Sequence, residues 1–71
     1  MFYQVIRIFF KGENKSHSVE YHDDYNAALQ RYFNVIAADL ANEQVTYNAA
    51  YLIDNAGGVI RKDIFDRRNE D

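Results

Sequence analysis

The chain has 71 residues, a formal net charge of −3 and no cysteine. Its length predicts one small domain over residues 1–71, and the missing cysteines exclude disulfides and thiolate metal sites. The mildly acidic balance argues against a general nucleic-acid binder, and no apolar run approaches the ~20 residues of a transmembrane helix.

The N-terminal segment MFYQVIRIFF is apolar but has no preceding basic region and no small-residue cleavage site, so it does not predict a signal peptide. We therefore expect a cytoplasmic protein with no membrane partner. Residues 2–11 instead predict a strand, because β-branched and aromatic residues dominate them. The even-numbered positions are the more apolar, so we expect them to face a covering helix, with Tyr3, Val5 and Phe9 on the far side.

Residues 12–22 complete a predicted hairpin. The polar stretch GENKS at 12–16 favours a loop. Residues 17–22 alternate between apolar and polar positions, which predicts a shorter second strand.

Residues 24–41 carry the one long helical period of the chain. Asp23 or Asp24 is suited to cap its first turn, because a carboxylate accepts from the free amides there and meets the positive end of the helix dipole. Asn42 is suited to end the helix, and Asp39 falls on the solvent side. The side chains expected to face the sheet recur at offsets of three and four: Tyr25, Leu29, Tyr32, Phe33, Ile36, Ala37 and Leu40.

Residues 45–54 and 59–65 predict a second hairpin, joined by a turn at 55–58 with two glycines free to take positive φ. Residues 67–71 predict a charged, frayed tail. The order ββαββ predicts an α+β fold, a four-stranded antiparallel sheet with one helix packed on one face. The order of the two hairpins within the sheet stays open.

No catalytic or metal-binding constellation emerges. His17 and His22 are an odd number of positions apart in one strand, so their side chains point to opposite faces and do not converge on a metal. Ser16 and Ser18 lack an oxyanion site, and the acids are scattered. We therefore predict a non-enzymatic protein with no catalytic, cofactor-binding or metal site and no cofactor.

Nucleic-acid binding has one feature in its favour and two against. Tyr3, Phe9 and Phe65 could stack single-stranded bases, but the motif K/R-G-F/Y-G/A-F-V of RNA-binding sheets is missing. The basic residues of the C-terminal region are interrupted and followed by acids, a pattern typical of a solvated, self-paired face. They are Arg61, Lys62, Arg67 and Arg68.

Six tyrosines and five phenylalanines are more than one helix–sheet interface hides easily, since each ring encloses roughly 150–250 Å². The alternative is that all of them belong to the core, with ordinary residual exposure. We predict instead that the sheet face away from the helix is a protein interface, because tyrosine and phenylalanine are enriched at such sites. The predicted interface, which includes nearby exposed acids, consists of Tyr3, Val5, Arg7, Phe9, Glu20, Asp23, Asp24 and Phe65.

The segments FYQVIRIFF, DYNAALQRYF and YLIDNAGGVIRK resemble, in pattern and size, small uncharacterised proteins of phages and prophages of Gram-positive bacteria. No catalytic or binding residue carries over from that family. The resemblance implies an accessory protein that occupies the surface of a host protein, such as a CRISPR effector, in the host-cell cytoplasm. The first hypothesis is thus a protein-binding inhibitor of a host defence system, acting by steric occlusion. The second is a self-associating structural or virion-associated dimer, and the third is a single-strand nucleic-acid binder.

Overall fold

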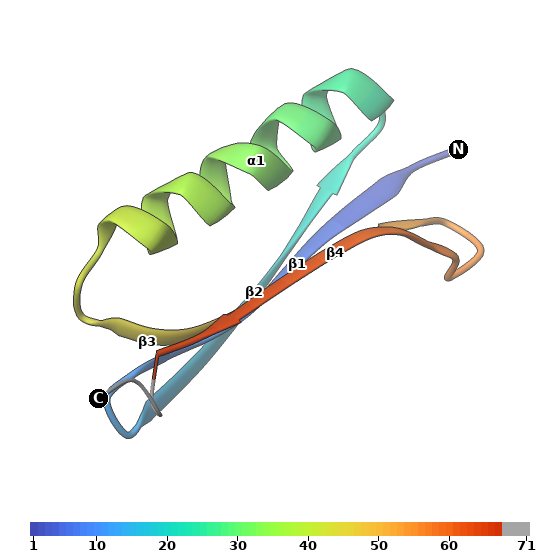
Figure 1. Ribbon diagram of the computed structural model, residues 1–71. Helices are drawn as coiled ribbons and strands as arrows, with labels where there is room; N and C mark the ends of the chain where they lie inside the picture. Colours follow the sequence, from blue (N-terminus) through green and yellow to red (C-terminus); the bar gives the residue numbers. More distant parts are fainter. Residues whose placement is uncertain (68–71) are drawn as a thin grey trace.

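The computed structural model describes residues 1–67 and confirms the α+β fold (Figure 1). The elements follow the order ββαββ: β1 (Tyr3–Lys11), β2 (Asn14–His22), α1 (Tyr25–Ala41), β3 (Val45–Asp54) and β4 (Val59–Asp66). The four strands form one antiparallel sheet in the order β2-β1-β3-β4. The helix lies across one side of this sheet, which we call the helix face, and no helix or strand within residues 1–67 covers the other side (Figure 1).

The first hairpin is tighter than predicted, because β2 begins at Asn14 and not at residue 17. Gly12 takes φ 64°, and Lys11 pairs with Asn14 across a two-residue turn. A glycine with positive φ in the first central position is what a type II′ hairpin turn requires. The twist of that turn matches the strands, so pairing continues to the turn itself and the predicted five-residue loop does not form.

The helix connects two strands that are not neighbours. Both β2 and β3 are antiparallel to β1, so they run parallel to each other with β1 between them. The path β2–α1–β3 is therefore a crossover connection, and it has the right-handed sense that nearly all such crossovers have (Figure 1). This handedness decides which face of the sheet receives the helix.

Capping residues define both ends of α1. The Asp24 carboxylate accepts from the Ala27 backbone N–H at 2.9 Å, which confirms Asp24 as the N-cap. At the other end, the Asn42 N–H donates to the carbonyls of Ala38 and Asp39. The predicted helix and its two boundaries are thus confirmed.

Arg67 closes the C-terminal end of α1 from outside the helix. Its Nη2 donates to Leu40 O at 2.6 Å, and its Nη1 donates to Asn42 O at 3.1 Å and Val45 O at 3.2 Å. Helix C-termini present carbonyls without intrahelical donors, and a guanidinium satisfies several at once. The prediction that the frayed tail begins at Arg67 is therefore wrong, and the rest of that tail, residues 68–71, lies outside the described residues.

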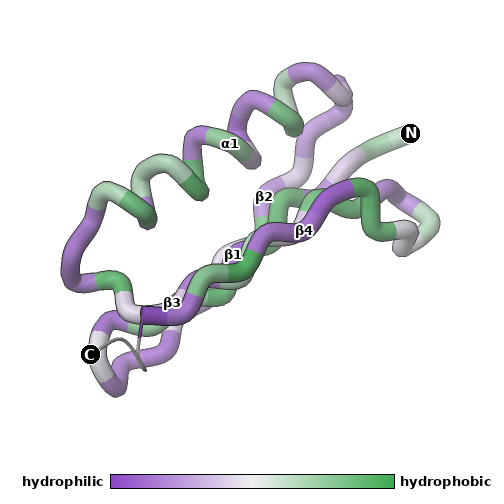
Figure 2. The backbone as a smooth tube through the Cα atoms, in the orientation of Figure 1, coloured by the Kyte–Doolittle hydropathy of each residue, from purple (hydrophilic) through white to green (hydrophobic). Residues whose placement is uncertain are grey.

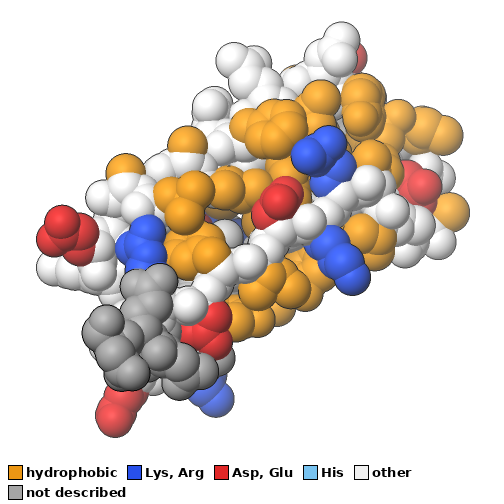
Figure 3. Space-filling model, in the orientation of Figure 1, with side chains coloured by type: hydrophobic (Ala, Val, Ile, Leu, Met, Phe, Trp, Pro, Cys, Tyr) orange, Lys and Arg blue, Asp and Glu red, His pale blue; other side chains and the backbone are white. Residues whose placement is uncertain are grey.

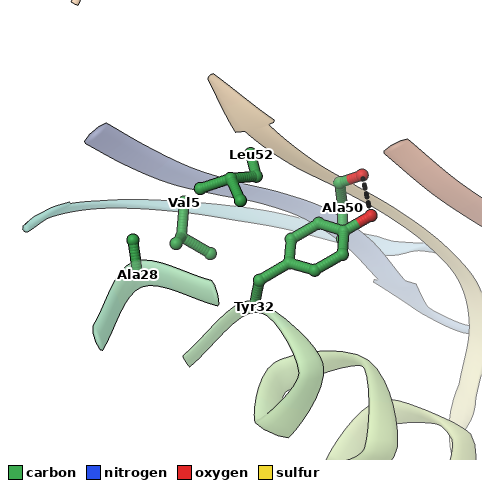
Figure 4. Close-up of a cluster of buried hydrophobic side chains, with 5 residues drawn as sticks. All are labelled: Val5, Ala28, Tyr32, Ala50 and Leu52. Carbon is green, nitrogen blue, oxygen red and sulfur yellow. Dashed lines mark hydrogen bonds between the residues drawn. The ribbon is translucent and has the colours of Figure 1, made fainter. Parts of the chain in front are cut away.

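The core between helix and sheet is small and centres on Tyr32 (Figure 4). The Tyr32 hydroxyl lies 3.5 Å from Ala50 O and donates to the Asp63 carboxylate on β4. Burial raises the pKa of this phenol above its usual value, and the acceptor Asp63 acts in the same direction. The buried cluster consists of Val5, Ala28, Tyr32, Ala50 and Leu52.

The buried stripe of α1 is rotated from the predicted one. It follows the helical spacing and consists of Ala28, Tyr32, Val35 and Asp39. Phe33 and Leu40, expected to face the sheet, remain 46% and 50% exposed. Small side chains such as Ala28 let the helix approach the strands closely, so the sheet contact does not follow the row of largest apolar residues.

The assignment of the two faces of β1 is also wrong. Odd-numbered Val5 is 1% exposed beneath the helix, whereas even-numbered Ile8 is 39% exposed on the far side. The apolar content of the strand favoured the opposite arrangement. The right-handed crossover prevails because it is a property of the whole connection and not of β1 itself.

Candidate interaction surface

The sheet surface opposite α1 is the most prominent feature left uncovered, and we call it the open face. The strand register identifies its side chains, which alternate with those under the helix. Its members, strand by strand in the order β2, β1, β3 and β4, are Lys15, His17, Val19 and Tyr21; Gln4, Ile6, Ile8 and Phe10; Tyr47, Ala49, Tyr51 and Ile53; Val59, Lys62, Ile64 and Asp66.

The open face is apolar and exposed along three of its four strands. Tyr21 and Val19 on β2 are 68% and 44% exposed, Ile8 on β1 is 39%, and Val59 and Ile64 on β4 are 57% and 53%. Hydrophobic side chains gather below β4, on the side away from the helix (Figure 3). Hydrophobic residues occur in every strand as well as along α1, so the helix covers only part of them (Figure 2). A contiguous apolar patch of this kind marks an interaction site in small proteins.

Charged side chains on the open face lie on its outer strands. One cross-strand row runs from Lys15 on β2 through Phe10 and Tyr47 to Asp66 on β4. The two rings in the middle of this row are 5.2 Å apart, and the Lys15 ammonium lies 5.9 Å from the Phe10 ring centre. An apolar centre with a charged rim is the usual composition of a protein interface.

Tyr3 and Val5, predicted interface residues, are on the helix face and not on the open face. Val5 belongs to the buried core, and Tyr3 packs against it. The Tyr3 ring also meets the Tyr25 ring of α1, edge to face at a centroid distance of 5.4 Å. These two side chains therefore hold the helix to the sheet.

Arg7 and Phe9 lie on the helix face as well, next to the buried polar side chains of Asp39 and Asn48. The Arg7 Nη1 is 3.4 Å from the Asp39 Oδ1, and its guanidinium stacks over the Phe9 ring at 4.1 Å. Asp39 is 6% exposed and Asn48 is 1% exposed. Within the part of the chain that the structure describes, the Asp39 Oδ2, the Arg7 Nε and both side-chain polar atoms of Asn48 are buried without a hydrogen-bond partner. We call these three residues, Arg7, Asp39 and Asn48, the polar cluster.

The pKa of Asp39 is shifted by its surroundings in the polar cluster. Burial raises the pKa of Asp39 above the ordinary value of 3.8, and the nearby charges of Arg7 and Lys11 oppose that rise without cancelling it. The sequence analysis placed Asp39 in solvent. Its position four residues after Val35, in line with Ala28 and Tyr32, is the signal that could have revealed its burial.

Phe65, the last aromatic of the predicted interface, also lies on the helix face, opposite Asn48 in the register. The Arg67 guanidinium stacks over its ring at 4.8 Å. Phe65 thus supports the arginine that closes the helix, and it does not extend the open face.

Of the acids in the predicted interface, Glu20 is separated from the open face by the sheet. Glu20 lies on the helix face of β2, where the Arg31 Nη2 donates to its Oε2 at 2.9 Å. This hydrogen bond is the main reason that the pKa of Glu20 is lowered, although burial opposes it. Asp24 caps the helix, and Asp23 precedes it in the connection between β2 and α1. Glu20 therefore does not lie on one surface with the apolar side chains of the open face.

Among the described residues, the histidine and acid side chains do not gather into a metal site, and no pocket forms that could enclose a substrate. His17 is on the open face and His22 on the helix face, as their odd spacing predicted. Among residues 1–67, no three histidine or acid side chains come together as metal ligands, and no pocket is enclosed. No helix within this part of the chain combines the length and apolar character needed to cross a bilayer.

Comparison with protein-family models, with curated proteins and with solved structures found no match to this chain. The functional argument accordingly rests on the geometry of the surface.

Proposed function

We propose that the protein is a non-enzymatic protein-binding module and that the open face is its binding surface. The observation that carries this proposal is the exposure of Ile8, Val19 and Ile64, on three different strands of one face that no described helix or strand covers. Apolar area left in water costs roughly 25 cal/mol per Å² relative to burial. A partner that covers this face recovers that free energy.

The size of the open face suits a protein partner. Strands of 8 to 10 residues spaced about 4.8 Å apart give it a footprint of roughly 600 Å². That value is at the upper end of the largest apolar patch on an ordinary monomer, roughly 300–600 Å². A flat, wide apolar surface fits another protein surface better than it fits a small molecule, which binds in a concave site.

The charges of the molecule favour a protein partner over nucleic acid. The formal net charge is −3. On the open face, the two lysines, Lys15 and Lys62, are accompanied by the acid Asp66. Binding to a phosphate backbone depends on a cluster of basic residues. In the phage setting that the resemblance implies, a protein-binding module acts as an inhibitor when it covers the surface of a host defence protein.

The test uses matched substitutions on the two sides of the molecule. Ile64 on the open face and Leu40 on α1 are 53% and 50% exposed, so Ile64→Arg and Leu40→Arg introduce the same change at equal exposure. Each tagged variant is expressed with an untagged wild-type copy in a Gram-positive host and recovered from nuclease-treated lysate.

Wild type and Leu40→Arg are expected to retain one stoichiometric protein, either a host protein or the untagged copy, and Ile64→Arg is expected to lose it. Mass spectrometry identifies the retained protein, and circular dichroism verifies that each variant is folded. Retention by all three proteins, or by none, would show that the open face is not the binding surface.

A further inference from the structure

We infer that the partner of the open face is a second copy of this chain, packed face to face about a two-fold axis that runs parallel to the strands. This inference rests on the proposed function, because it names the occupant of the same surface. Two observations carry it: the placement of charges on the open face and the area that the face offers.

A face-to-face pair of identical sheets has two simple two-fold arrangements. An axis parallel to the strands reverses the strand order, so β2 of one copy lies over β4 of the other and β1 lies over β3. Each cross-strand row then faces the same row of the second copy. An axis perpendicular to the strands keeps the strand order and places the first row against the last.

The parallel axis brings opposite charges together. Lys15 on β2 and Asp66 on β4 occupy the two ends of one row. Strand reversal therefore sets Lys15 of each copy opposite Asp66 of the other, which forms two symmetry-related pairs at the rim. The perpendicular axis instead sets Lys15 against Tyr21 and Asp66 against Val59, so neither side chain meets an opposite charge of the second copy.

The other rows are compatible with the parallel axis. Lys62 lies opposite Val19 of the second copy, where its aliphatic stem can cover the apolar side chain while its ammonium remains in water. His17 lies opposite Ile64, and Tyr21 lies opposite Val59. No row places two like charges against each other.

The area meets the lower limit of a specific interface. Two faces of roughly 600 Å² each give about 1,200 Å² in total, the smallest value typical of stable complexes. Aligned sheets pack about 10 Å apart at a small angle, which keeps the central apolar rows in contact. Homodimer interfaces are also more apolar than transient ones, as this face is.

The test is a charge-reversal cycle measured by sedimentation velocity over a range of protein concentrations. Wild type is expected to sediment as a dimer at micromolar concentration. Lys15→Asp and Asp66→Lys each place two like-charge pairs in the dimer and are expected to weaken it about tenfold or more. The double variant restores both pairs and is expected to return to within about threefold of wild type.

A matched control separates the pair from the change in total charge. Glu43 is exposed in the segment before β3, so Glu43→Lys alters the net charge as Asp66→Lys does, and it is expected to leave the dimer unchanged. Circular dichroism of each variant verifies folding. The absorbance ratio of the dimer peak at 260 and 280 nm reports any bound nucleic acid.

Several results would overturn this inference. If wild type sediments as a monomer, the second-copy inference is wrong. The proposed function would still stand in that case if Ile64→Arg alone loses a host protein in the capture experiment. A dimer that Ile64→Arg disrupts but the charge reversals do not would contradict the parallel axis. A dimer insensitive to both would indicate pairing through an edge strand of the sheet, β2 or β4, and a complex that depends on nucleic acid would identify a different occupant.

Discussion

On the helix face of the sheet, Val5 and Arg7 lie beneath α1, whereas Ile6 and Ile8 on the opposite face of the same strand have no element above them. The covered face includes the polar cluster, with four buried polar atoms that lack partners. The uncovered face has apolar side chains in its central strands and charges only on its outer strands. The helix therefore covers the more polar of the two faces.

This difference shows that α1 does not occupy the position that would bury the largest apolar area of the sheet. A fold that left its most apolar surface bare for no purpose would lose solubility without any gain in stability. We propose that the open face is the surface that binds a partner, whereas the helix face supplies the core of the isolated chain. Three substitution experiments can break or sharpen this comparison.

The largest expected effect is on the helix face. Leu52 is fully buried in the core, and Leu52→Ala is expected to cost about 2–5 kcal/mol of unfolding free energy. A core in a chain of this size supplies only about 3–5 kcal/mol, so this variant should be largely unfolded in the absence of stabilising conditions. Urea unfolding followed by circular dichroism measures the loss.

Ile8→Ala on the open face provides the contrast, since Ile8 is 39% exposed. Its expected cost in dilute protein is less than about 1 kcal/mol. If a second copy covers the face, this cost should grow with protein concentration, because binding stabilises only the folded chain. Equal losses for Ile8→Ala and Leu52→Ala in the dilute monomer would contradict the distinction between the faces.

An intermediate effect is expected where β4 closes the helix. Arg67→Ala removes donors from the carbonyls of Leu40, Asn42 and Val45. A hydrogen bond that involves a charged group contributes about 1.5–3 kcal/mol to the free energy of unfolding. The Arg67 side chain is partly exposed, so we expect Arg67→Ala to lower that free energy by about 1–2 kcal/mol. Thermal unfolding measures this loss, with Lys62→Ala on β4, the strand that Arg67 follows, as the control. A loss no greater than that of the control would mean that Arg67 does not hold the helix end.

The smallest expected effect is in the polar cluster and appears as a dependence on pH. Because the folded-state pKa of Asp39 is raised above 3.8, the folded chain binds more protons than the unfolded chain in the window above that value. Stability from this group therefore falls as pH rises through the window. Asp39→Asn should remove that dependence and raise stability near neutral pH by about 1 kcal/mol.

Glu20 provides a control of opposite sign. Its pKa is lowered from 4.5, mainly by the hydrogen bond from Arg31, so its contribution is present above that value and is lost as pH falls through the folded pKa. Glu20→Gln should cost about 0.5 kcal/mol at neutral pH, as expected for an exposed ion pair. Urea unfolding between pH 3.5 and pH 7 measures both variants. A pH profile of Asp39→Asn identical to that of wild type would contradict the assignment.

Much of the secondary structure was predictable because its causes are local. The capping carboxylate of Asp24 and the positive φ of Gly57 in the 55–58 turn act within a few residues of their own position, although the second glycine, Gly58, does not take positive φ. The predicted strand at 45–54 is confirmed without change. The hairpin at Gly12 was misjudged because the two-residue turn and a five-residue loop have the same polar composition. The identity of that turn depends on one positive φ value, which composition does not reveal.

The surface was predictable in kind but not in its residues. The excess of aromatic and aliphatic side chains indicated an exposed sheet face, and such a face exists. The predicted residues Tyr3, Val5, Arg7, Phe9 and Phe65 have the parity of the covered face, because the more apolar side of β1 is the open one. The pattern does not reveal the burial of Asp39 either, because a charged side chain ordinarily faces water.

The sequence by itself determined the elements, their order and the alternation that assigns each strand residue to one of two faces. Only the tertiary structure decided which face the helix covers, and with it the identity of the open face. The physical reason is that α1 joins two parallel strands on either side of β1, and the right-handed twist of the strands permits that connection over one face alone. Local hydrophobicity acts within each element, whereas the handedness of the connection belongs to the assembled sheet.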